Sequence, residues 1–151
     1  MSRESRPKFI DLFAGCGGFS LGFCQAGWQG ILAIEKDPSA FKSFQANFLG
    51  EAGRNRFDWP EWLDQQAWDI RVVLKKHRKE LKALRGQVTA VIGGPPCQGF
   101  SFAGPRSGSD PRNKLFHAYV KFVRLVRPRF VLIENVGGIR VKHAKKLGKT
   151  A

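Results

Sequence analysis

Short apolar segments alternate with helical patterns along most of this chain, and this alternation restricts its fold more than any other feature. Strands are expected at residues 8–13, 30–34, 88–92 and 130–133, with a short further strand that ends at Trp68-Asp69. Helices are expected over residues 19–26, 37–48, 70–85 and 113–126. Strands that alternate with helices are typical of a parallel sheet with helices on both faces, and strands that are apolar throughout indicate that both faces are covered. The pattern therefore predicts an α/β fold with a doubly wound, mostly parallel, Rossmann-like sheet of about five strands.

The size and charge of the chain restrict its class and its partners. Its 151 residues, 42% of them hydrophobic, are sufficient for one domain over residues 1–151. There are 26 Lys and Arg against 12 Asp and Glu, so the formal net charge is +14. Basic residues are concentrated in residues 71–85 and after Glu134. Excess positive charge favours a nucleic-acid partner, although a solvated helix face or the acidic surface of a partner chain would also account for it.

The cysteines and the N-terminal residues indicate a reducing compartment. Cys16, Cys24 and Cys97 are odd in number and lack the spacing of metal ligands, so we expect free thiols and no metal. The first residues lack the apolar segment of a secretory signal, and no run approaches the length of a membrane span. We expect a cytoplasmic protein, in the bacterial cytosol or nucleoid, with no membrane partner.

A glycine-rich turn follows the first expected strand. Gly15, Gly17 and Gly18 come between this strand and the next helix, where glycine permits tight turns and close approach of a ligand. Glu35 ends the second strand 20 residues after Gly15, where an acid can accept hydrogen bonds from ribose hydroxyls. The pattern favours a nucleoside-type cofactor, although a tight turn and a surface carboxylate would also explain it.

Two further strand ends carry side chains with possible chemical roles. Asp69 could accept a hydrogen bond from an adenine amino group while Ile70 packs on the ring, but a helix N-cap explains Asp69 equally well. Cys97 follows the strand over 88–92 on a stiff Pro95-Pro96 turn, and Glu134 ends the last strand. A thiolate there is a candidate nucleophile, and the alternatives are a small buried cysteine and a glutamate that caps a turn.

Taken together, these segments resemble the cytosine-5 methyltransferase family. FIDLFAGCGGFSLGF is similar to its cofactor motif, GGPPCQGFS to its nucleophile motif, LIENV to its catalytic glutamate motif, and DPRNKLF to the segment after its mobile catalytic loop. The resemblance covers nearly all of residues 8–140. It implies a methyltransferase sheet that binds S-adenosyl-L-methionine and acts on double-stranded DNA.

The resemblance also assigns roles to particular residues. Cys97 and Glu134 match the catalytic pair. The positions that match cofactor-binding residues are Phe13, Ala14, Gly15, Gly17, Gly18, Glu35, Lys36, Asp69, Ile70, Pro96 and Leu115. Nucleic-acid contacts are expected from Gln98, Ser101, Arg112 and Asn135. The family often has a large aromatic or apolar side chain where this chain has Lys36, so adenine stacking here would be weaker or would rely on the lysine stem.

The chemistry expected of the catalytic pair follows from the poor nucleophilicity of cytosine C5. Addition of the Cys97 thiolate at C6, with Glu134 holding N3, makes C5 an enamine carbon that can accept a methyl group. The base must leave the duplex stack for this reaction. Loss of the C5 proton then expels Cys97 and restores the ring.

The chain lacks three regions that the family has after the catalytic glutamate: an Arg-containing motif, a target-recognition region and a terminal helix that completes the cofactor pocket. We therefore expect a sheet edge and apolar surface to be uncovered. Three explanations remain open: one subunit of a two-chain methyltransferase, a fragment or truncated product, and a non-catalytic module that binds cofactor or nucleic acid. The first is preferred, with a second polypeptide that supplies target recognition and little activity without it.

Other function classes stay open from the sequence alone. A tRNA cytosine-5 methyltransferase fragment fits the same motifs and charge, and a scaffold with a vestigial site has no need of both Cys97 and Glu134. A dehydrogenase would need nicotinamide binding, and the chain lacks the full G-x-G-x-x-G pattern because Phe19 and Ser20 follow Gly18. The target sequence is not encoded in any of these features.

Overall fold

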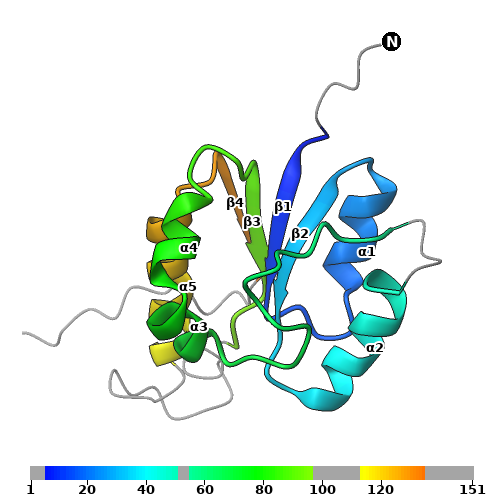
Figure 1. Ribbon diagram of the computed structural model, residues 1–151, viewed down its shortest axis with the longest axis horizontal. Helices are drawn as coiled ribbons and strands as arrows, with labels where there is room; N and C mark the ends of the chain where they lie inside the picture. Colours follow the sequence, from blue (N-terminus) through cyan, green and yellow to red (C-terminus); the bar gives the residue numbers. More distant parts are fainter. Residues whose placement is uncertain (1–5, 51–54, 97–112, 135–151) are drawn as a thin grey trace, which may run out of the picture.

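Four parallel strands form a single sheet in the computed structural model, which describes residues 6–50, 55–96 and 113–134. The strands are β1 (Lys8–Leu12), β2 (Gln29–Ile34), β3 (Ala90–Gly93) and β4 (Phe130–Ile133), in the order β2-β1-β3-β4 (Figure 1). β1 is central and pairs with β2 on one side and β3 on the other. β2 is added on one side of β1, and β3 and β4 are added on the other side, so the strand order reverses between β1 and β3. Open α/β sheets bind ligands at the carboxyl ends of the strands beside such a reversal.

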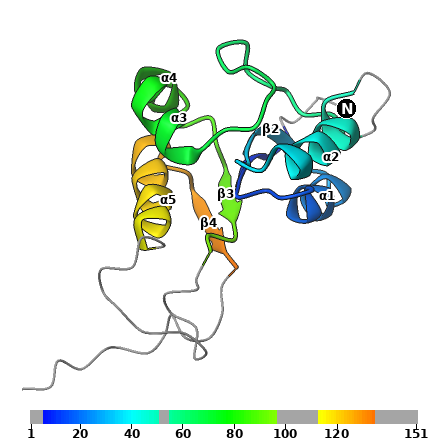
Figure 2. The same ribbon diagram turned by 90° about the horizontal axis from the view of Figure 1, so that it is seen from below.

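Five helices cover the two faces of the sheet in this part of the chain. α1 (Gly18–Gln25) and α2 (Pro38–Phe48) lie on one face, and α3 (Ile70–Lys76), α4 (Arg78–Ala83) and α5 (Asn113–Val126) lie on the other (Figures 1 and 2). The predicted doubly wound α/β fold is therefore confirmed. None of the helices in the described ranges has the length and apolar character needed to cross a membrane.

Each face of the sheet has its own hydrophobic core. Between the sheet and α1 and α2, Phe9, Phe44, Phe48 and Phe57 form a contiguous aromatic cluster with ring centroids 4.7 to 5.5 Å apart. On the other face, Tyr119 and other apolar side chains of α5 pack against β1 and β3. Burial of such large side chains contributes roughly 1.5–3 kcal/mol each, so these two layers stabilise the relative positions of the strand ends.

The start of α2 is determined by local sequence. The Asp37 side chain accepts a hydrogen bond from the Ala40 backbone N–H at 2.8 Å, and Pro38 occupies the first helical turn. Both features satisfy or remove N–H groups that a helix start leaves unpaired. The predicted boundary is confirmed, and it places the end of β2 and Glu35 immediately before a rigid helix.

The expected single helix over residues 70–85 is instead two helices separated at His77. The backbone of His77 has φ −115° and ψ 34°, outside the helical range, although its N–H still bonds to the Val73 carbonyl. Its ring lies 5.2 Å from the Trp62 ring and 6.0 Å from the Trp68 ring. Tertiary packing against these tryptophans accounts for a break that helical periodicity does not predict.

The prediction of a short strand that ends at Trp68-Asp69 is wrong. This segment has no regular secondary structure, and its connection to the sheet is one hydrogen bond of 2.7 Å from the Trp68 N–H to the Glu35 carbonyl. One bond fixes the position of the segment beyond the end of β2 but makes no ladder. The described sheet consequently has four strands where about five were expected.

β4 is an exposed edge strand. Its residues Phe130, Val131, Leu132 and Ile133 are 60%, 45%, 46% and 36% exposed, although their composition is that of a buried strand. The expected uncovered sheet edge and apolar surface are thus confirmed. The expectation that all strands are covered on both faces does not hold for β4.

Candidate cofactor cleft and catalytic edge

The ends of β1 and β2 form a cleft with the start of α3 and the first turn of α5. It is lined by Phe13, Ile34, Lys36, Trp68, Asp69, Ile70 and Leu115. Five of these residues were predicted from the sequence, although they come from four separate segments of the chain. The structure therefore brings Phe13, Lys36, Asp69, Ile70 and Leu115 together at the carboxyl ends of the strands.

Phe13 has a backbone conformation that is uncommon for a residue with a side chain. Its φ is +60°, in the left-handed region that mainly glycine adopts. The conformation ends β1 sharply and directs the chain into the glycine turn, while the half-buried Phe13 ring lines the cleft. Strained backbone of this kind is frequent at functional sites.

The glycine turn is held by the Glu35 carboxylate. Glu35 Oε2 accepts a hydrogen bond from the Gly15 N–H at 2.9 Å, and Oε1 accepts one from the Asp37 N–H at 2.8 Å. Each carboxylate oxygen can accept more than one hydrogen bond. Two backbone amides thus orient the carboxylate and leave it acceptor capacity for a ligand.

The three predicted turn glycines have different surroundings. A Cβ on Gly15 would meet no atom within 4 Å, so this position is open to a ligand, whereas a Cβ on Gly17 would lie 2.3 Å from the Phe48 ring. Gly17 is thus required for packing of the turn on α2, with φ of 97°. Gly18 is exposed at the start of α1 and lies outside the cleft lining.

Asp69 is the N-cap of α3. Its side chain accepts a hydrogen bond from the Arg71 N–H at 2.8 Å and forms an ion pair with the Arg71 guanidinium. These hydrogen bonds with Arg71 hold the pKa of Asp69 below its usual value, aided by the nearby charge of Lys36. The capping alternative is therefore confirmed, and the same ionised carboxylate lines the cleft.

Ile34 and Trp68 also line the cleft, and neither was predicted from the sequence as a cofactor-binding residue. The Trp68 indole N–H donates to the Asp64 carbonyl at 2.9 Å, and Lys76 lies 5.7 Å from the ring centroid. Trp68 directly precedes Asp69 in the sequence, and this position could have indicated that it lines the cleft. The segment was instead predicted to be a strand. Trp68 supplies an aromatic surface in the cleft where Lys36 offers only a stem.

The candidate catalytic edge, called the catalytic edge below, lies where β3 and β4 end side by side. Gly93 pairs with Ile133, and the Glu134 N–H donates to the Gly93 carbonyl at 3.0 Å. A Cβ on Gly94 would lie 3.0 Å from Glu134 Oε2, so the carboxylate lies directly against the backbone after β3. Cys97 follows three residues later, but it lies outside the described residues, as do Gln98, Ser101, Arg112 and Asn135.

The two remaining cofactor predictions, Ala14 and Pro96, lie outside the cleft lining. Ala14 is 9% exposed and its carbonyl accepts a hydrogen bond from the Gly17 N–H at 2.9 Å, so it closes the glycine turn. Pro96 is exposed after β3 and does not line the cleft. The structure thus separates Pro96 from the five residues that share the cleft.

A buried carboxyl group lies beneath the glycine turn. Asp11, on β1, is 1% exposed, and its Oδ2 accepts a hydrogen bond from the Ser20 hydroxyl at 2.7 Å. Its Oδ1 is buried and has no hydrogen-bond partner among the described residues. Burial raises the pKa of Asp11 to about 7, and the Glu35 charge acts in the same direction.

Comparison with known proteins agrees with this geometry. Residues 7–151 match the family model of the C-5 cytosine-specific DNA methylase. The chain belongs to this family. Its relatives include type II methyltransferase M.DdeI of Desulfomicrobium norvegicum, 45% identical over 87% of the chain and 28% of M.DdeI. Type II methyltransferase M.HgiGI of Herpetosiphon aurantiacus is 38% identical over 89% of the chain and 94% of M.HgiGI.

A solved structure shows the same fold. It is a prophage-encoded E. coli chain described as a DNA modification methyltransferase, with a TM-score of 0.65, 32% identity, and coverage of 90% of this chain and 34% of that one. The chain also spans about a third of the length of most curated relatives it matches, for example 28% of M.DdeI and 31% of M.XorII of Xanthomonas oryzae. Most of the length of such cytosine-5 methylases thus has no counterpart in these 151 residues.

The chemistry of the cleft residues suits the methyl donor that the family implies, S-adenosyl-L-methionine. The mostly apolar lining includes the Asp69 carboxylate, and Glu35, which does not itself line the cleft, lies between Ile34 and Lys36, which do. This set of apolar side chains and acids suits an adenosine with its hydroxyl and amino donors. The open position above Gly15 leaves room for a ligand beside the turn. The cleft is narrow, with a free volume of about 10 Å³, so its side chains must separate when a ring enters.

Proposed function

We propose that this chain transfers a methyl group from S-adenosyl-L-methionine to C5 of cytosine in DNA, with Cys97 as nucleophile and Glu134 as the group that holds N3 of the base. One observation carries this proposal. The Glu134 carboxylate lies against Gly94, just after β3, which leads toward Cys97 in the sequence and pairs with β1, the strand that ends at the cleft residue Phe13. An acid at the end of β4, a cysteine that follows β3 in the sequence, and a candidate nucleoside cleft at the ends of β1 and β2 suit this reaction.

The cofactor would be held by residues from both sides of the cleft. Glu35 would accept hydrogen bonds from the ribose hydroxyls, and Asp69 one from the adenine amino group. Phe13, Trp68, Ile70 and Leu115 would pack on the adenine ring. When bound, the cofactor supplies a methyl group on a positively charged sulfur.

The chain's own residues activate the cytosine. The Cys97 sulfur forms a bond to C6 as the C5–C6 double bond opens, and Glu134 holds N3 so that the electron pair is shared between C5 and the ring. After C5 is methylated, loss of its proton re-forms the double bond and releases Cys97 as thiolate. The target base has to leave the duplex for these contacts, at a cost of a few kcal/mol.

Target recognition is proposed to come from a complementary chain. The curated relatives are mostly about three times as long as this chain, and recognition of a DNA sequence requires groove contacts beyond the cofactor sheet. The exposed β4 edge supports the proposal, because further strands could pair there. We infer that the chain alone transfers little methyl group to DNA.

A covalent trapping experiment tests the catalytic pair and the partner together. The chain is mixed with S-adenosyl-L-methionine and a DNA duplex containing 5-fluorocytosine, with and without a candidate partner chain that carries a target-recognition region. Because fluorine at C5 blocks release of the enzyme, a competent site forms a protein–DNA adduct that survives denaturation. We expect the adduct only with both chains present, reduced at least about a hundredfold in Glu134→Gln and absent in Cys97→Ala.

Four outcomes would contradict parts of this proposal. An adduct that persists in Cys97→Ala would exclude the assigned nucleophile. Robust sequence-specific methylation by the isolated chain would exclude the need for a partner. An adduct with fluorinated transfer RNA but not with DNA would favour a tRNA methyltransferase, and complete absence of adducts with intact cofactor binding would favour a binding module.

A further inference from the structure

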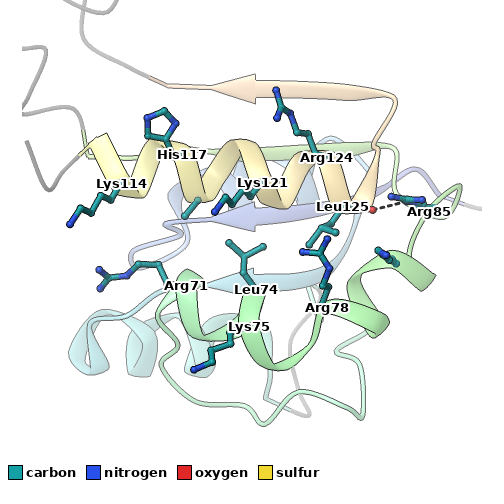
Figure 3. A pocket seen from close by; sticks show the side chains of 12 residues that line it. Arg71, Leu74, Lys75, Arg78, Arg85, Lys114, His117, Lys121, Arg124 and Leu125 are labelled. Atoms are coloured by element: carbon teal, nitrogen blue, oxygen red, sulfur yellow. Dashed lines mark hydrogen bonds between the residues drawn. The ribbon is translucent and has the colours of Figure 1, made fainter. Parts of the chain in front are cut away.

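A broad groove separates α3 and α4 from α5 on the face of the sheet opposite α1 and α2 (Figure 3). Its volume is about 800 Å³. The lining residues come only from these three helices and the turn after α4: Arg71, Leu74, Lys75, Arg78, Lys82, Arg85, Lys114, His117, Ala118, Lys121, Arg124 and Leu125. We call it the basic groove.

The lining is strongly cationic and contains no carboxylate. Eight of the twelve lining residues are Lys or Arg, and only two of these eight are engaged. Arg71 forms the ion pair with Asp69, and Arg85 Nε donates to the Leu125 carbonyl at 2.8 Å. The other six have no ion pair or hydrogen bond within the ranges that the structure describes. Like charges gathered in this way repel one another unless an anion binds.

Buried core residues form the floor of the groove, and cationic residues line both of its sides. Ala118 and Leu125 are only 4% and 7% exposed, and they belong to the core between α5 and the sheet. In Figure 3, Leu74 and Arg78 extend toward α5, whereas Lys75 points away from it. The Arg85–Leu125 bond joins the end of α4 to the end of α5. The spacing of the two rows of cations is therefore set by packed helices.

The groove begins at the same edge as the cofactor cleft. Ile70 and Leu115 line the cleft, and their neighbours Arg71 and Lys114 line the groove. From there, α3, α4 and α5 lead away from the catalytic edge, toward the opposite ends of the strands (Figure 2). A polyanion that reaches the catalytic edge would thus meet the first cations of the groove.

We propose that the basic groove binds the phosphodiester backbone of duplex DNA that flanks the target base, independently of sequence. The choice of DNA rests on the proposed function, whereas the anionic character of the ligand rests on the groove itself. An acidic protein helix is the rival occupant, but a docked helix needs a row of apolar anchors, and the floor offers only Leu74, Ala118 and Leu125. Two rows of cations on a short floor suit phosphates better.

A duplex of alternating dA and dT provides the test, because it contains no cytosine and its binding cannot depend on methyl transfer. Binding of this labelled duplex to the full chain is measured by fluorescence anisotropy between about 50 and 200 mM salt. The groove variant carries Arg78→Gln and Lys121→Gln, one from each side. The control variant carries Arg56→Gln and Lys42→Gln, which are exposed and lie outside the groove lining.

We expect the groove variant to lose affinity roughly tenfold or more near 0.1 M salt, and its salt slope to decrease by about two, since each phosphate contact contributes about 0.9 to that slope. The control variant should stay within about twofold of the unmodified chain, apart from the small effect of net charge. Thermal unfolding of both variants checks that they are folded.

The proposal is overturned if the groove variant binds the duplex with unchanged affinity and slope, or if both variants weaken binding equally. It is also overturned if a double-stranded RNA of the same length binds more than about tenfold tighter and shows the same dependence on Arg78 and Lys121. Failure of methyl transfer with groove-dependent DNA binding would contradict only the proposed function.

Discussion

The carboxyl group of Asp11 links folding to pH. Its folded-state pKa, about 7, lies above the ordinary value of 3.8 because the group is buried, so the folded state binds the proton more tightly than the unfolded state. This contribution to the free energy of unfolding, on the order of 4 kcal/mol, is fully present below pH 3.8 and is lost as the pH rises through about 7.

Asp11→Asn should therefore remove a decline in stability between about pH 4 and 7. Urea denaturation at several pH values measures the difference in unfolding free energy between variant and unmodified chain, which should change in favour of the variant as pH rises. Asp58→Asn, at an exposed carboxyl, serves as the control with a constant difference. A constant difference for Asp11→Asn as well would contradict the assignment.

Trp68 is expected to support adenine in place of the aromatic side chain that Lys36 replaces. Trp68→Ala should weaken binding of S-adenosyl-L-methionine about tenfold, because a ring contact of this type contributes about 1 kcal/mol beyond burial, and Trp68→Phe should retain most of the affinity. Isothermal titration calorimetry of the three proteins measures this directly. Equal loss in both variants would indicate a role of the indole N–H bond to Asp64 rather than of the ring.

At the scale of elements, the pairing of β1 with β3 depends on Gly93. Its φ is +154°, and a Cβ there would lie against the Leu12 carbonyl, with the oxygen at 2.0 Å. Gly93→Ala should force the two strand ends apart and cost about 3 kcal/mol of stability, measured by thermal or urea unfolding. Gly22→Ala is the matched control, since a Cβ on Gly22 meets nothing within 4 Å and alanine favours helix by up to about 1 kcal/mol. Similar effects at both positions would exclude the steric argument.

Element boundaries follow from local sequence only where a local interaction determines them. The Asp37-Pro38 start of α2 and the span of α5, Asn113–Val126, were predicted correctly. The break at His77 and the irregular segment at Trp68 were not, because both depend on the mutual packing of Trp62, Trp68 and the His77 ring. These residues are 6 to 15 positions apart along the chain, which is beyond the reach of helical or strand periodicity.

At the scale of the whole molecule, the exposed apolar edge of β4 should make the isolated chain associate with itself. An unpaired edge strand with four exposed apolar residues offers both hydrogen-bonding groups and apolar surface to another copy. Sedimentation velocity over a range of concentrations should show association, and Phe130→Lys should reduce it. Val72→Lys, on α3 and 38% exposed, should leave association unchanged. A chain that is monomeric at all concentrations would contradict the prediction.

The sequence alone determined the family, four parallel strands with helices between them, and the residues of the candidate cofactor cleft that come from motifs, because these depend on short patterns of apolar residues, glycines and acids. Only the tertiary structure decided that Gly17 packs on Phe48, that Trp68 joins the cleft, and that basic residues of α3, α4 and α5 meet in one groove. Each of these facts requires segments distant along the chain to be brought into contact, and it is the packing of helices on the two faces of the sheet that does so.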